Sequence, residues 1–159
     1  LDQHFRAHRF LLGDRPCLAD FALYGPLKAH FLADPTPHGI IDAQGPALMD
    51  YAGRMAAARA ASTPEWPRLE AVPETLAPVL QHIGIYFHAY LVTNRDGLRA
   101  HRETVEIDTG YGPKTLAVRP YSEKTRADTA ADIAGYDVAV QEKLRAALEP
   151  LGVWHAYRL

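Results

Sequence analysis

Apolar residues recur at intervals of three and four along most of the chain, which predicts a mainly helical protein. The first predicted helix has no N-cap residue ahead of its apolar face, so we expect the chain to be part of a longer polypeptide. Proline-rich segments are expected to separate the later helices. The predicted helices are 1–12, 18–32, 45–61 and 73–93, and the predicted breaks are 34–39 and 62–67.

Gly25-Pro26 lies in the middle of the second predicted helix. A proline in a helix interior removes one backbone hydrogen bond and clashes with the preceding turn. We therefore expect this helix to bend between Ala22 and Pro26.

The period changes to two after Asp96-Gly97, a pair that is expected to end the fourth helix. Val105 and Ile107 alternate with polar residues, and the alternation resumes at Leu116, beyond the turn-forming segment 110–113. Alternating positions on both sides of such a turn predict a β-hairpin.

The segment Thr129–Asp132 has the Ser/Thr-x-x-acid spacing of a capping box, which predicts the start of the last helix. The apolar stripe of that helix runs from Ile133 to Leu151. Together these segments predict the fold class: a mainly α helical bundle with a β-hairpin added before the last helix.

The segment Phe10–Leu27 carries the most specific pattern in the chain. Gly13 is expected to close the first helix in the left-handed conformation that glycine adopts at low cost. Cys17 takes the N-cap position of the next helix, and Asp20 takes the N3 position. There the carboxylate can accept hydrogen bonds from backbone N–H groups at the positive end of the helix.

This ordered run, Leu-Leu-Gly-Asp and then Cys-x-Ala-Asp before an apolar helix, resembles the start of the core helix in the C-terminal, all-helical domain of glutathione transferases. The family has Ser or Thr where this chain has Cys17. Tyr51 and the pair Arg54-Met55 resemble the helix that follows in the family. The resemblance implies one helical domain over 1–159. Residues 1–61 would be its transferase-like core, and residues 62–159 an extension with the long helix, the hairpin and the final helix.

The resemblance implies a function for the chain as well. In glutathione transferases, a preceding thioredoxin-like domain binds and activates glutathione, while the helical domain supplies part of the pocket for a hydrophobic electrophile and a dimer surface. By this resemblance the chain itself is not catalytic, and glutathione would be bound by a domain outside it. Tyr24, Tyr86 and Tyr90 could line the co-substrate pocket, although core packing explains each equally well. The alternative is a stand-alone, non-catalytic binding or scaffold domain with the same fold.

Two further groups of residues could carry chemistry. Arg119, Lys124 and Arg126 lie within eight residues of one another and could bind a carboxylate or a phosphate, although a charged turn is usually solvated. Cys17 lies at a predicted helix N-terminus, which favours a thiolate. Asp20 disfavours a second negative charge there, so a structural cap is the preferred interpretation over a reactive thiol.

Composition narrows the possible partners. The net charge is −2, from 17 basic and 19 acidic residues, and it indicates neither nucleic acid nor an anionic membrane surface as partner. No apolar stretch is long enough to span a membrane. The single cysteine fits a reducing cytoplasm. His4 and His8 could share a helical face, but no third ligand is identifiable, and we expect no metal site.

Overall fold

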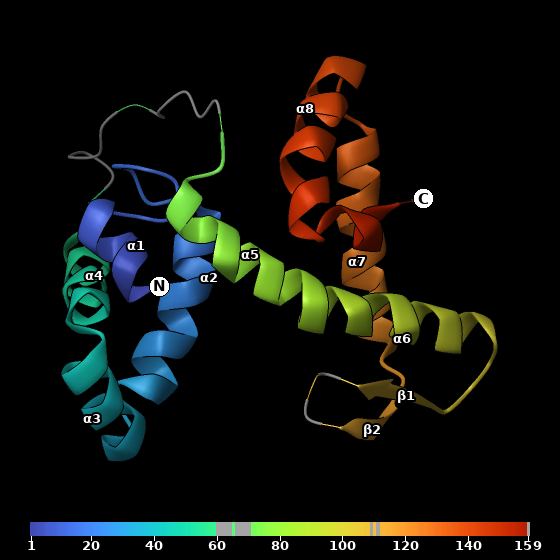
Figure 1. The fold of residues 1–159 in the computed structure, drawn as a ribbon, viewed down its shortest axis with the longest axis horizontal. Coiled ribbons are helices and arrows are strands. Elements are labelled where there is room, and N and C mark those ends of the chain that lie inside the picture. The colour runs from blue at the N-terminus through green and yellow to red at the C-terminus, as the bar shows by residue number, and fades with distance from the viewer. Residues whose placement is uncertain (60–64, 66–70, 109, 111, 159) are drawn as a thin grey trace. The chain divides into compact units, whose positions relative to one another are not determined.

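The computed structural model describes residues 1–59, 65, 71–108, 110 and 112–158. It is mainly helical and contains a small antiparallel hairpin (Figure 1). The chain divides into two compact units, unit 1 (Leu1–Leu76) and unit 2 (Ala77–Leu159). The expected single domain over 1–159 stays a prediction.

Unit 1 is built of helices around an aromatic core. The rings of Phe5 and Tyr51 stack with their centroids 3.8 Å apart, and Tyr51 is fully buried. Phe10, Leu27 and Met55 complete the centre of this core. Its helical elements are α1 (Asp2–Ala7), α2 (Leu18–Pro26), a π-helical turn η1 (Leu27–Phe31), α3 (Pro35–Gln44), α4 (Pro46–Ala57) and a short 3₁₀ turn η3 (Glu74–Leu76).

The first helix is shorter than predicted. It ends at Ala7, because His8 takes an extended conformation with φ −129° and ψ 143°. The backbone then forms a tight turn in which the Phe10 N–H donates to the Gly13 carbonyl at 2.9 Å. Gly13 does have a positive φ, 118°, but it serves this turn and does not cap the helix.

The second helix begins at Leu18 as predicted, with Cys17 as its N-cap. Directly after Pro26, the hydrogen bonding changes from α to π: the Leu32 N–H donates to the Leu27 carbonyl, five residues earlier. The ring of Pro26 offers no N–H to the preceding turn. The irregularity that the structure shows is this π-helical turn after the proline, and the bend expected between Ala22 and Pro26 stays a prediction.

The predicted break at 34–39 is the start of a helix. Asp34 caps α3 by accepting a hydrogen bond from the Thr36 N–H at 2.9 Å, and Pro35 occupies the first helical position. The next helix, α4, covers most of the range predicted for it and ends at Ala57. The predicted connector 62–67 lies outside the described residues, except for Glu65.

Unit 2 begins with a long helical stretch and ends with short turns. Its elements are α5 (Ala77–Ile83), a π-helical turn η4 (Gly84–His88), α6 (Ala89–Arg99), β1 (Thr104–Asp108), β2 (Pro113–Ala117), α7 (Pro120–Ala134), α8 (Val138–Leu148) and the 3₁₀ turns η5 (Glu149–Leu151) and η6 (Trp154–Tyr157).

The long helix does not end at Asp96-Gly97. It continues to Arg99, and Gly97 is buried within it. A Cβ at Gly97 would lie 2.4 Å from Cγ1 of Val105. This glycine is a point of close contact between α6 and the hairpin, and it does not stop the helix.

The π-helical turn η4 also changes which residues face the core. The apolar face expected for this helix includes Phe87 and Leu91. Leu91 is buried as expected, whereas Phe87 is 53% exposed and its neighbour His88 is buried instead. The wider π-helical turn changes the direction of the side chains within it, so the stripe predicted from a regular helix fails at Phe87.

The predicted hairpin is confirmed. Strands β1 and β2 pair antiparallel, with Val105 opposite Leu116 and Ile107 opposite Lys114. Val105 and Ile107 are buried while their neighbours along β1 are exposed, as the alternation predicted.

The capping box predicted at Thr129–Asp132 is wrong. Thr129 lies in the middle of α7, where its hydroxyl donates to the Thr125 carbonyl one turn earlier. The helix begins at Pro120, whose fixed φ suits the first helical position. The chain then breaks after α7, and α8 starts with Asp137 as its N-cap residue.

Gly84 offers a test of the packing in unit 2. A Cβ there would lie 2.7 Å from the backbone oxygen of Gly152, so Gly84→Ala forces the backbone apart. We expect a loss of about 1–3 kcal/mol in the free energy of unfolding, measured by urea denaturation. Gly53→Ala in α4 is the matched control, because no atom lies within 4 Å of its Cβ position. The control should gain up to about 1 kcal/mol from helix propensity. Equal stability of the two variants would contradict the close contact.

Candidate functional site

Asp20 is fully buried and connects three segments of unit 1. Its Oδ2 accepts a hydrogen bond from the Cys17 N–H at 2.9 Å, and its Oδ1 accepts one from the Leu11 N–H at 2.9 Å. Its backbone carbonyl accepts a hydrogen bond from the Tyr51 hydroxyl at 3.1 Å. The carboxylate therefore fixes both the turn before α2 and the start of that helix.

Cys17 is buried at the N-cap of α2. Burial is the main cause that raises the pKa of its thiol, and the hydrogen bond and charge of Asp20 raise it further. The thiol therefore stays protonated at neutral pH. These properties support the structural cap and weigh against a reactive thiol.

The three candidate tyrosines lie in different settings. Tyr24, in α2, is half-buried against the core of unit 1. Tyr86 and Tyr90 belong to unit 2, and the ring of Tyr86 lies 4.1 Å from that of His82. The hydroxyl of Tyr90 is buried and has no hydrogen-bond partner among the residues that the structure describes. None of the three lines the pocket of unit 2 described below.

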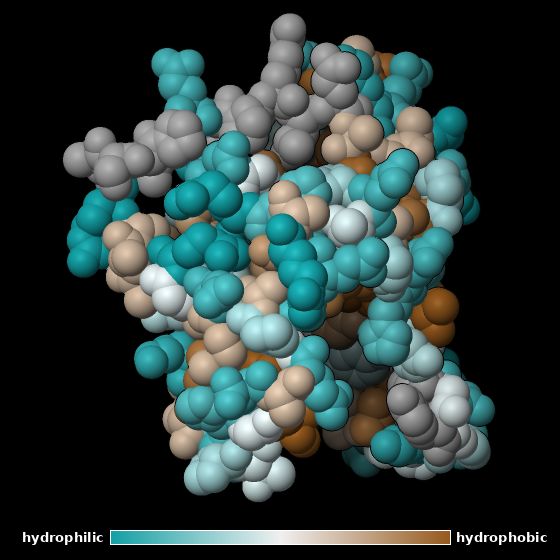
Figure 2. Space-filling model, turned by 60° about the vertical axis from the view of Figure 1, so that its left-hand side comes forward, coloured by the Kyte–Doolittle hydropathy of each residue, from teal (hydrophilic) through white to brown (hydrophobic). Residues whose placement is uncertain are grey.

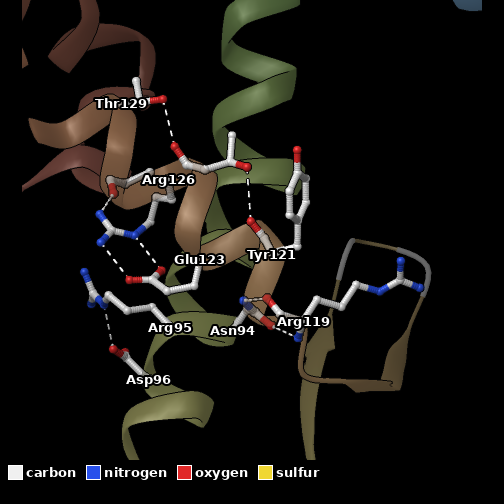
Figure 3. A network of polar contacts seen from close by, with 10 residues as sticks. Asn94, Arg95, Asp96, Arg119, Tyr121, Glu123, Arg126 and Thr129 are labelled. Carbon is white, nitrogen blue, oxygen red and sulfur yellow. Dashed lines mark hydrogen bonds and ion pairs between the residues drawn. The ribbon is translucent and has the colours of Figure 1, made fainter. Parts of the chain in front are cut away.

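Arg119 is the N-cap residue of α7, and Lys124 and Arg126 lie in the first two turns of that helix. Figure 3 shows Arg119 and Arg126. Arg126 is buried and forms a two-pronged ion pair with Glu123, at 2.7 and 2.9 Å, and its Nη1 also donates to the Ala156 carbonyl at 2.9 Å. Lys124 pairs with Asp128 on the helix surface. The side chain of Arg119 points away from Arg126, so the three cations do not converge on one anion (Figure 3).

A buried asparagine sets the start of α7. Asn94, in α6, accepts a hydrogen bond from the Arg119 N–H at 2.7 Å and donates one to the Arg119 carbonyl at 3.1 Å (Figure 3). Both groups of the side-chain amide are thus bonded to one backbone position. This contact joins residues 25 positions apart and has no local sequence signal.

His88 and Tyr157 form a buried pair in unit 2. His88 Nδ1 lies 2.9 Å from the Val153 carbonyl, which can only accept, so this nitrogen carries the proton. The other ring nitrogen is then the acceptor for the Tyr157 hydroxyl at 3.3 Å. Burial lowers the pKa of His88, and burial raises the pKa of Tyr157, so both side chains are neutral at pH 7.

An open pocket of about 580 Å³ lies within unit 2, a volume typical of small-molecule sites. The lining residues come from α7, α8, η5 and the C-terminal turn. The polar, charged and aromatic residues among them are Gln141, Arg145, Glu149, Trp154, Tyr157 and Arg158.

This pocket could not be predicted from the sequence, because its aromatic and charged residues follow no recognised motif. Glu123 and Arg126 are three residues apart on one helix, and this spacing could have indicated that the arginine forms an ion pair.

Three further observations concern the surface, a possible membrane span and possible metal sites. On the face drawn in Figure 2, brown apolar side chains emerge between teal polar ones. In the described part of the chain, no helix is long and apolar enough to cross a membrane. No group of three or more His, Cys, Asp and Glu side chains that could hold a metal ion occurs among the described residues.

The chain matches no family model, and comparisons with curated proteins and with solved structures found no match either.

Replacing Asp20 tests its role as a buried connector. Asp20→Ala leaves the N–H groups of Leu11 and Cys17 without their acceptor, and we expect a loss of about 2–4 kcal/mol in the free energy of unfolding. Asp34→Ala, at the exposed cap of α3, removes a single hydrogen bond and should cost only about 0.5–1 kcal/mol. Urea denaturation followed by circular dichroism measures both. A loss for Asp20→Ala no larger than that of the control would refute this role.

The His88–Tyr157 pair predicts a pH dependence. Burial lowers the pKa of His88 below the value of 6.5 for a free imidazole, so the unfolded chain binds the proton more readily. The free energy of unfolding should fall as the pH drops through 6.5, by at most about 1.4 kcal/mol per pH unit for this histidine. Buried His4 adds an effect of the same sign.

Urea denaturation at pH 7.5 and 5.5 measures this dependence. His88→Asn can still donate to the Val153 carbonyl but does not titrate, so the variant should lose part of the pH dependence. His82→Gln, which removes an exposed imidazole, is the control and should retain all of it. An unchanged pH dependence in His88→Asn would contradict the prediction that His88 contributes to it.

Proposed function

We propose that this chain is the C-terminal helical domain of a glutathione transferase-like protein. The observation that carries the proposal is the buried Asp20 carboxylate, which bonds to the backbone at Cys17 and in the Leu-Leu-Gly turn. These are the positions at which the sequence resembles the family. Helix α4 supports the proposal, because its Tyr51 packs in the core of unit 1 and donates a hydrogen bond to the backbone carbonyl of Asp20.

In this proposal the chain is a specificity and scaffold domain. Glutathione is bound and activated by a thioredoxin-like domain encoded ahead of Leu1, and its sulfur attacks a hydrophobic electrophile. Tyr24, half-buried at the edge of the core, is the tyrosine of unit 1 that could contact such a substrate. A homodimer and a cytoplasmic location stay predictions. Leu18 and Phe21, which are 84% and 57% exposed, are apolar side chains of α2 that a second copy could cover.

The mass of the native gene product tests the proposal. We expect a product larger than 17.6 kDa by a domain of about 80 residues, measured by intact mass spectrometry from the source cells. The purified full-length product should conjugate glutathione to 1-chloro-2,4-dinitrobenzene, and the 159-residue chain alone should not.

Asp20→Ala in the full-length product separates folding from chemistry. It should lower thermal stability but leave the affinity for glutathione unchanged where the protein stays folded, because glutathione binds outside this chain. A native product of about 17.6 kDa, or a longer product that does not bind glutathione, would overturn the proposal. Either result would favour the alternative, a non-catalytic binding or scaffold domain.

A further inference from the structure

The pocket of unit 2 is lined by residues of mixed character. Ala130, Ile133 and Ala134 of α7 contribute small and apolar side chains, and Trp154 and Tyr157 of η6 contribute aromatic ones. Flat aromatic walls favour a flat apolar ligand, because ring–ring contact adds to the area that is buried.

The side chain of Tyr157 is held in position by a hydrogen bond. Its hydroxyl is bonded to His88, whose own ring is fixed by the Val153 carbonyl. Both partners belong to unit 2 and are half-buried or buried. A wall fixed before binding loses little conformational freedom when a ligand enters.

The charged residues that line the pocket carry an excess of positive charge. Arg145 and Arg158 line it, and both pair with the same carboxylate, Glu149. One glutamate balances one of the two arginines, which leaves one positive charge. Both arginine side chains are more than 60% exposed, so their pairs with Glu149 are weak and can be exchanged for a ligand.

We propose that this pocket binds a small aromatic carboxylate, with the ring against Trp154 and Tyr157 and the carboxylate at Arg145 and Arg158. A planar guanidinium matches a carboxylate through two parallel hydrogen bonds. The proposal does not depend on the transferase-like function, because every residue of the pocket lies in unit 2, beyond residues 1–61 that carry the resemblance.

Calorimetric titration of the 159-residue chain with 4-phenylbutyrate tests the site. We expect saturable binding that weakens as salt is raised. The uncharged isostere 4-phenylbutyramide should bind at least tenfold more weakly, because it cannot pair with the arginines. In a Trp66→Phe background, Trp154 is the remaining tryptophan, and its emission should change on binding.

Matched arginine variants complete the test. Arg158→Gln should weaken binding of 4-phenylbutyrate at least fivefold, and Arg145→Gln/Arg158→Gln should weaken it further. Arg99→Gln removes an exposed arginine outside the pocket and should change the affinity less than twofold. The arginines are exposed, so circular dichroism should show unchanged folding.

Three results would overturn the proposal. The first is no binding of 4-phenylbutyrate up to about 5 mM, which is weaker than a specific site of this size should give. The second is equal affinity for the amide, which would show that the charge is not recognised. The third is an equal loss in Arg99→Gln and Arg158→Gln, which would indicate a nonspecific charge effect.

Discussion

Buried backbone groups need hydrogen-bond partners, and in each unit a fully buried side chain bonds to the backbone at the start of a helix. In unit 1, Asp20 accepts from the backbone of two segments that precede its own helix. In unit 2, Asn94 bonds both backbone groups of Arg119 and so fixes the start of α7. The helices that follow each junction take their starting positions from these contacts. An apolar side chain of the same size could not replace either residue, because the backbone groups would remain unsatisfied.

Asp20 and Asn94 differ in how far along the chain they act, and this difference explains how much of the fold could be predicted from the sequence. Asp20 acts on residues three and nine positions away, so the start of α2 was readable from a local pattern. Asn94 acts 25 positions away, and the start of α7 was missed for that reason. The hairpin was predicted correctly because alternation of apolar and polar residues is also a local signal, although burial follows that alternation only in β1, and every residue of β2 is exposed. The end of the long helix was not, because Gly97 is set by contact with Val105 in the tertiary structure.

The candidate site residues also differ in whether a local sequence pattern could reveal them. The cluster of cations near Arg126 was visible in the sequence, but its ion pair with Glu123 and its bond to Ala156 become evident only in the fold. The pocket of unit 2 was not visible, because its walls come from separate elements and no motif links them. Local patterns therefore identified residues with suitable chemistry, and the fold decided which of them share a surface.

Solvent exposure separates the arginines that stabilise the fold from those that can bind a ligand. Arg126 is 5% exposed, and breaking its pair with Glu123 would leave a buried guanidinium without its partner. Exchange of Glu123 for a ligand is therefore costly. Arg145 and Arg158 pair with Glu149 in water, where an exposed ion pair contributes about 0–1 kcal/mol. A ligand carboxylate that also buries an aromatic ring gains more than this, so the same residue type has opposite roles at the two positions.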